Sequence, residues 1–76
     1  MLVRPAEIRQ ILTTLNLSQA AFARSTGVSR SYISRLLRGE RANPSKLFTL
    51  HVVHLCRAHG LTDLAAEIDS RVSHEP

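Results

Sequence analysis

The chain holds 76 residues with a mass of 8.4 kDa, and a chain of this length has room for one domain with one modest core. We therefore expect no separate catalytic or ligand-sensing domain. The formal net charge is +4 and the sequence pI is near 10.7, which favours a negatively charged partner. Residues 1–46 hold eight basic and two acidic side chains, against two and four in residues 47–76, so the first half is the candidate binding face.

The residue types also indicate where the protein works. The single Cys56 cannot form an intramolecular disulfide, and residues 1–5 lack the apolar stretch of a signal peptide. No apolar run approaches the roughly 20 residues that span a bilayer. We therefore expect a cytoplasmic protein.

Five helices separated by short breaks are predicted along the chain. Their apolar spacing and stop signals place them at residues 5–15, 18–25, 29–38, 45–59 and 62–73. Suitable N-cap residues begin four of them: Ser18, Ser29, Ser45 and Thr62. No segment alternates as a strand does. The predicted fold is therefore all-α, a compact five-helix bundle.

The last two helices carry apolar stripes that predict packing and dimerisation. In the fourth helix the expected stripe is Leu47, Leu50, Val53 and Leu55. In the fifth it is Leu64, Ala65, Ile68 and Val72. We expect residues 1–76 to form a single domain in which these helices pack against a helix-turn-helix core at residues 18–39.

The segment from Gln19 to Arg38 meets the steric demands of a helix-turn-helix. Ala23 is expected where the two helices approach most closely, because a larger side chain there would force them apart. Gly27 sits at the turn, where a positive φ is needed. The space around the crossing is filled by Phe22, Val28, Ile33 and Leu36.

Short motifs within and after this segment carry a family resemblance. Leu17-Ser18-Gln19-Ala20 stands before Ala23 and Gly27, and Arg38-Gly39-Glu40-Arg41 stands before Pro44. The pattern resembles the Cro and phage-repressor class of helix-turn-helix regulators, also called Xre-like, over about residues 5–59. The resemblance implies a five-helix bundle with a helix-turn-helix of the lambda-repressor-like kind, and a DNA-binding transcription regulator of the phage or plasmid kind.

The resemblance also implies that the third helix enters the major groove of double-stranded DNA. The base-contacting residues would then be Arg30, Ser31, Ser34 and Arg35. Gln19 would bond a phosphate and buttress a side chain of the third helix. The other expected phosphate contacts are Arg38, Arg41, Asn43 and Lys46.

Two groups of residues admit more than one interpretation. The ring of Tyr32 either packs beside the first or fourth helix as partial core, or its hydroxyl contacts a phosphate. His51, His54, Cys56 and His59 suggest a metal site, and zinc needs four converging ligands. Cys56 points about 160° away from His54 at roughly 100° per residue, so we expect no metal and no other cofactor.

One recognition helix covers only a few base pairs, so we expect a homodimer. A two-fold axis would place the two recognition helices about 34 Å apart, which requires a palindromic operator. The expected interface residues are Val53, Leu64, Ile68 and Val72. Such a dimer would act as a repressor by blocking polymerase.

No catalytic arrangement is found in the sequence, and we expect no enzymatic activity. It has no phosphate-cradling glycine loop, no paired carboxylates near a histidine, and no nucleophile with an identifiable base. The alternative function is an antitoxin-like or other protein-interaction module, which would bind a partner such as a toxin, with DNA binding secondary.

Overall fold

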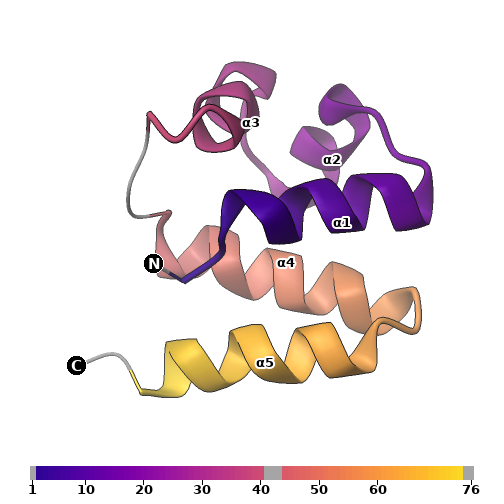
Figure 1. Cartoon of the computed structure of the whole chain (residues 1–76), viewed down its shortest axis with the longest axis vertical. Coiled ribbons are helices and arrows are strands. Elements are labelled where there is room, and N and C mark those ends of the chain that lie inside the picture. The colour runs from indigo at the N-terminus through magenta and orange to yellow at the C-terminus, as the bar shows by residue number, and fades with distance from the viewer. Residues whose placement is uncertain (1, 41–43, 75–76) are drawn as a thin grey trace.

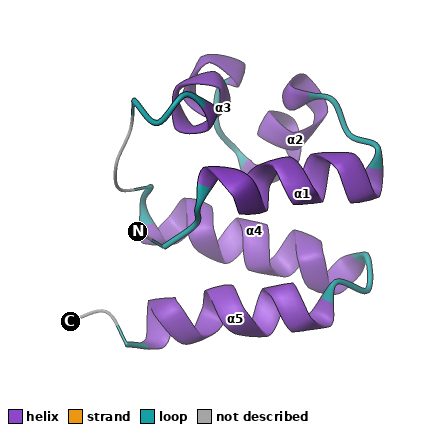
Figure 2. Cartoon of the chain, in the orientation of Figure 1, coloured by secondary structure: helices purple, strands orange, loops and turns teal. Residues whose placement is uncertain are grey.

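The structure is a computed structural model that describes residues 2–40 and 44–74. Within these residues the chain forms five α-helices and no strand (Figure 1, Figure 2). The helices are α1 (Pro5–Leu15), α2 (Gln19–Thr26), α3 (Arg30–Leu37), α4 (Lys46–Ala58) and α5 (Thr62–Ser73). The prediction of an all-α bundle with a helix-turn-helix is confirmed. None of these helices is both long and apolar enough to cross a membrane.

Serine caps explain where three of the helices begin. The hydroxyl oxygens of Ser18, Ser29 and Ser45 each accept a hydrogen bond of 3.1 Å from the backbone N–H three residues later. These three predicted caps are confirmed. The predicted cap Thr62 is wrong, because Leu61 takes the N-cap position without a side-chain acceptor and Thr62 is the first helical residue.

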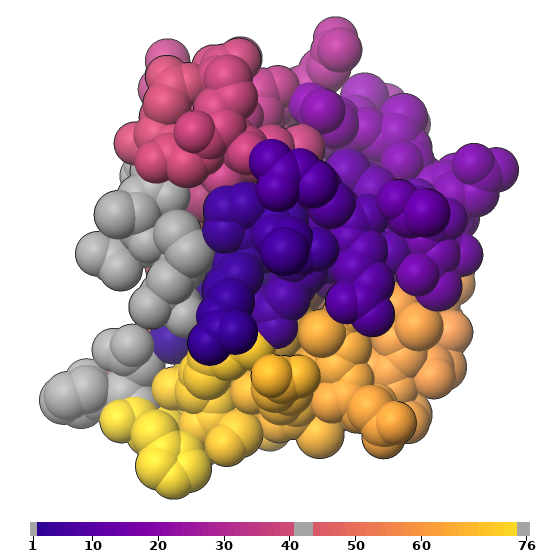
Figure 3. Space-filling view, in the orientation of Figure 1, coloured from indigo at the N-terminus to yellow at the C-terminus, as the bar shows by residue number. Residues whose placement is uncertain are grey.

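The helices surround one core to which each of them contributes. α2 and α3 lie on one side of α1, whereas α5 lies on the other, antiparallel to α4 (Figure 1). The space-filling view shows α3 at one end of the molecule and α5 at the opposite end (Figure 3). The core residues are Val3, Ile8, Ile11, Phe22, Ala23, Ile33, Leu36, Phe48, Val52, Val53, Cys56, Ala65 and Ile68.

The face that α4 turns to the core differs from the predicted one. The expected stripe began with Leu47 and Leu50, but 68% and 46% of their surfaces are exposed. The buried face consists of the predicted Val53 together with Phe48, Thr49, Val52 and Cys56, and the predicted Leu55 is partly buried against the core. Apolar residues occupy both faces of α4, and Phe48 favours the observed one because its ring packs edge-on against Phe22 and Tyr32.

Two residues that were expected at a dimer interface belong to the core of the single chain. Val53 is 2% exposed and Ile68 is fully buried, so neither side chain is available to a partner. The other two candidates, Leu64 and Val72, are half-buried. The apolar stripe of α5 is therefore largely used in packing within the chain.

A partly buried ion pair fastens α5 to the start of α1. Arg71 donates from Nη1 to Oε1 of Glu7 at 2.7 Å and to the backbone oxygen of Leu2 at 2.9 Å. Its Nη2 donates to the second oxygen of Glu7. Burial acts to raise the pKa of Glu7, but hydrogen bonds from Arg71 and the Arg4 N–H, with the charge of Arg71, lower that pKa overall. The hydrogen bond to Glu7 in turn raises the pKa of Arg71.

Candidate nucleic-acid interface

The turn between α2 and α3 is made by Gly27. Its φ of 75° lies in the left-handed region, which a residue with a Cβ adopts only at a cost. The backbone N–H groups of Gly27 and Val28 both donate to the carbonyl oxygen of Ala23, which ends α2. Ala23 itself is only 3% exposed. Gly27 thus has the positive φ that the sequence predicts, and Ala23 is buried beside it.

Apolar side chains beneath the two helices hold α3 on the core. Phe22, Ile33 and Leu36 are buried, and Val28 is partly buried against the same cluster. The Tyr32 ring lies 5.3 Å from that of Phe48 between centroids, in an edge-on arrangement. The interpretation of Tyr32 as partial core beside the fourth helix is therefore confirmed.

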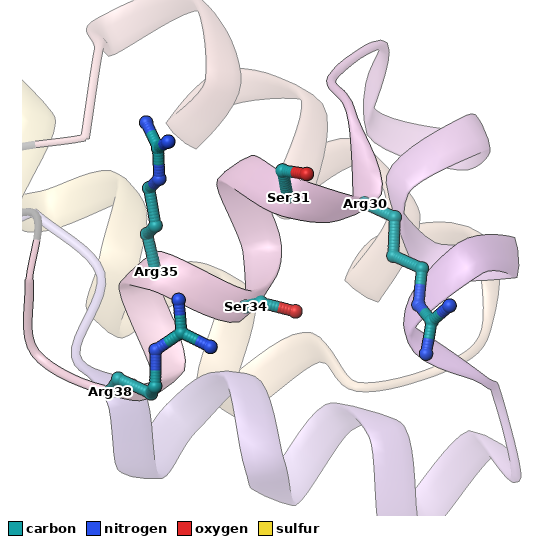
Figure 4. A pocket seen from close by; sticks show the side chains of 5 residues that line it. All are labelled: Arg30, Ser31, Ser34, Arg35 and Arg38. Atoms are coloured by element: carbon teal, nitrogen blue, oxygen red, sulfur yellow. The ribbon is translucent and has the colours of Figure 1, made fainter.

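The outer face of α3 presents a group of polar side chains, which we term the recognition face. Its members line an open hollow of about 290 Å³ and are Arg30, Ser31, Ser34, Arg35 and Arg38. Figure 4 shows the Ser31 and Ser34 hydroxyls between the guanidinium group of Arg30 on one side and those of Arg35 and Arg38 on the other. The structure thus brings together the four residues predicted to contact bases and adds a predicted phosphate contact beside them.

One hydrogen bond joins the recognition face to α2. The Ser34 hydroxyl donates to Oε1 of Gln19 at 2.9 Å, and both side chains are partly buried. The expectation that Gln19 buttresses a side chain of the third helix is confirmed. The amide nitrogen of Gln19 keeps its two N–H donors for other acceptors.

The charged residues in their first turns distinguish α2, α3 and α4 from α1 and α5. No acidic residue lies in the first turns of α2, α3 and α4, whereas α1 carries Glu7 and α5 carries Asp63 there. Acidic residues are normally favoured at a helix N-terminus, which is the positive end of the helix dipole. Arg30 and Lys46 instead add positive charge at the starts of α3 and α4. These helix starts therefore suit an external anion such as phosphate.

Two side chains near α3 have partners that sequence reasoning missed. Arg9 donates from Nη2 to the backbone oxygen of Leu37 at 2.6 Å, which ties α1 to the last turn of α3. Arg38 forms an ion pair with Glu40, and both side chains are exposed. The opposite charges two residues apart were a weak signal for the ion pair. Nothing local signals the Arg9 contact, since 28 residues separate its partners.

The remaining predicted phosphate contacts divide into two groups. Lys46 is the exposed first residue of α4. Arg41 and Asn43 lie outside the described residues. Their roles remain predictions from the sequence.

The histidines and the cysteine of α4 lie on different faces of that helix. Cys56 is fully buried, and burial raises the pKa of its thiol. His51 and His54 are exposed on α4, and His59 is exposed just beyond its end. Across residues 2–40 and 44–74, no three His, Cys, Asp or Glu side chains gather in a way that could hold a metal ion.

A glycine turn between two short helices, with a polar and basic second helix facing outward, defines a helix-turn-helix protein. A family model described as Helix-turn-helix matches residues 8–51, which is more than half of the chain. The chain belongs to this family, the Cro/C1-type or Xre-like helix-turn-helix proteins, which are DNA-binding transcription regulators. Comparisons with curated proteins and with solved structures gave no match.

Proposed function

We propose that this chain is a sequence-specific regulator that inserts α3 into the major groove of double-stranded DNA. The observation that carries the proposal is the recognition face, in which two hydroxyls lie between arginines on an exposed helix. The major groove of B-DNA is about 12 Å wide and admits an α-helix. In the groove, the base edges are flanked by phosphates. On the recognition face, the hydroxyls are flanked by cations, so the two surfaces are complementary.

The proposed base contacts come from the first two turns of α3: Arg30, Ser31, Ser34 and Arg35. Arg35 suits the O6 and N7 acceptors of guanine, and a good bidentate pair gives about 1–3 kcal/mol of discrimination. The O–H of Ser34 donates its hydrogen bond to Gln19, so we expect the Ser34 oxygen to act toward DNA as an acceptor. We therefore expect Ser34 to face the amino group of an adenine or a cytosine.

The proposed phosphate contacts lie around this face. Gln19 directs its amide donors from the start of α2, and Lys46 stands at the start of α4. Arg38 is the member of the recognition face at the end of α3, and the sequence adds Arg41 and Asn43. Contacts of this kind set the register and the affinity without reading the base sequence.

The proposed active form is a homodimer on a palindromic operator. Two copies related by a two-fold axis present their recognition helices about 34 Å apart, one turn of DNA. We propose that this dimer acts as a repressor, by occupying a site that polymerase needs. The supporting observation is that the recognition face lies on one helix of eight residues, which covers only a few base pairs of an operator.

The test is selection of bound fragments from a random duplex library at physiological salt, with Arg35→Ala and Arg38→Ala run beside the parent protein. Arg57→Ala serves as the matched control, because Arg57 pairs with Asp69 away from α3. We expect a palindrome with half-sites one turn apart. Arg35→Ala should relax the base preference at one position of the motif. Arg38→Ala should weaken binding to all sequences alike, and it should reduce the slope of affinity against salt by the amount that about one phosphate contact contributes.

Failure to enrich any motif with the parent protein would overturn this proposal. The protein-interaction alternative would then be examined by mixing the chain with the products of neighbouring genes. Enrichment that Arg35→Ala leaves unchanged, position by position, would remove Arg35 from the base contacts and leave the regulator itself standing.

A further inference from the structure

One exposed stripe of α4 is apolar, and we term it the α4 seam. Leu47, Leu50, His51 and His54 are all exposed and line a shallow hollow of about 260 Å³. Within the described part of the chain, Leu47 and Leu50 are the large hydrophobic residues classed as exposed, at 68% and 46%. Large apolar side chains in contact with water at one place indicate a surface that another molecule covers.

The spacing of the α4 seam is that of a helix-packing surface. Its members stand at offsets of three, four and seven residues, so they form one stripe over two helical turns. The opposite face of α4 carries Phe48 and Val52 in the core. A helix that is apolar on two faces is suited to packing on both of them.

The occupant that fits this stripe is a second copy of the chain. The seam carries no Asp, Glu, Lys or Arg, so two seams meet without opposed formal charges. Antiparallel packing about a two-fold axis sets the Leu47 end of one seam against the His54 end of the other, which makes the surface complementary to itself. A strongly charged or polar partner has no complement here.

We propose that the α4 seam is the surface through which two copies associate on the operator. This inference rests on the proposed function and names the interface that the function needs. Lys46, a proposed phosphate contact, directly precedes Leu47, and α4 begins on the side of the molecule where α3 lies (Figure 1). A copy docked on the seam is thus held beside the DNA-reading face. The seam takes the role in the dimer contact that was expected of Val53 and Ile68, which are buried in the core.

The small area of the seam and the positive charge of each copy indicate a dimer that forms on DNA and not in free solution. A stable interface buries about 800 Å² on each partner, whereas the seam spans only two helical turns. Each copy also carries a formal charge of +4, so free copies repel one another. An operator neutralises part of that charge and raises the effective concentration of the second copy. The free protein is therefore monomeric at micromolar concentration, and binding to the two half-sites is cooperative.

The test compares binding to a duplex with one half-site and to a duplex with two, using the operator selected above. The parent protein should bind the second half-site at least about tenfold more tightly than an isolated one. Leu47→Ser/Leu50→Ser should lose this cooperativity while its affinity for one half-site stays within about twofold. Leu47→Met/Leu50→Met should retain cooperativity. Val72→Ser changes the rival face on α5 and should retain cooperativity as well. Thermal unfolding of each variant verifies that it is folded.

Each result separates the α4 seam from the proposed function. Cooperative binding that survives Leu47→Ser/Leu50→Ser overturns the seam and leaves the regulator standing. Independent occupancy of the two half-sites by the parent protein overturns association on DNA. A parent protein that binds neither duplex overturns the proposed function, and this inference falls with it.

Discussion

Ser34 on α3 and Gln19 on α2 are joined by a hydrogen bond of 2.9 Å between hydroxyl and amide oxygen, which links the two helices of the helix-turn-helix at the recognition face. The bond orients both partners. Oε1 of Gln19 accepts from Ser34, so the amide donors of Gln19 and the acceptor lone pairs of the Ser34 oxygen remain for the phosphate and the base that we propose they contact. The hydrogen bond thus fixes the donor and acceptor roles of two proposed DNA contacts.

We predict that Gln19→Ala weakens binding to the selected operator by about tenfold, because it removes one phosphate contact and frees the Ser34 rotamer. Fluorescence anisotropy with a labelled duplex measures this loss. Gln10→Ala on the exposed side of α1 is the matched control and should bind like the parent. A double-mutant cycle with Ser34→Ala should show coupling, and strictly additive losses would contradict the proposed pairing.

We predict that Glu40→Gln raises the affinity for DNA by about two- to fivefold at low salt. The substitution removes a carboxylate that competes with phosphate for Arg38, and exposed ion pairs contribute up to about 1 kcal/mol. The gain should shrink as salt is added, because exposed charges are screened. Glu67→Gln changes the net charge equally on α5, so an equal gain from both variants would contradict a specific role of Glu40.

We predict that Glu7→Gln lowers the free energy of unfolding by about 1–3 kcal/mol at neutral pH, because it weakens the hydrogen bonds from Arg71. The pKa of Glu7 is lowered in the folded state, so the stabilisation from its ionised form is complete above its ordinary pKa of 4.5. That stabilisation is lost as the pH falls below 4.5 through the lowered value. Thermal unfolding from pH 7 to pH 3 should therefore bring the two proteins closer together. A constant gap across this range would contradict the prediction.

We predict that Gly27→Ala destabilises the fold by about 1 kcal/mol, which corresponds to a fall of roughly 4–8 °C in the unfolding midpoint. No heavy atom lies within 4 Å of a Cβ built at Gly27, so the cost comes from the φ of 75° alone. Gly27→Asn should cost less, because Asn tolerates the left-handed region better. Equal losses for the two variants would indicate a steric cause instead.

Most features that depend on neighbours in the sequence were predicted correctly, and the cap at Thr62 is the exception. The serine caps and the turn at Gly27 follow from hydrogen bonds and backbone angles within a few residues. The recognition face follows from helical spacing once α3 is in place. The geometry of α2 and α3 is therefore largely readable from the chain itself.

Several features that depend on distant partners were not predicted. Both faces of α4 are apolar, and the choice between them is made by the rings of Phe22 and Tyr32, which only the fold brings to Phe48. The ion pair of Glu7 with Arg71 joins residues 64 positions apart. The prediction that Val53 and Ile68 contact a second copy was wrong for the same reason. An apolar stripe does not reveal whether its partner lies inside the chain or in a second copy.

The ion pair between Glu7 and Arg71 also bears on how the chain folds. Its partners lie 64 positions apart, so bringing them together closes a long loop at a high cost in chain entropy. The contacts between α2 and α3 join residues close in sequence and close much shorter loops. We therefore expect the helix-turn-helix to form ahead of the ion pair, whose closure completes the fold.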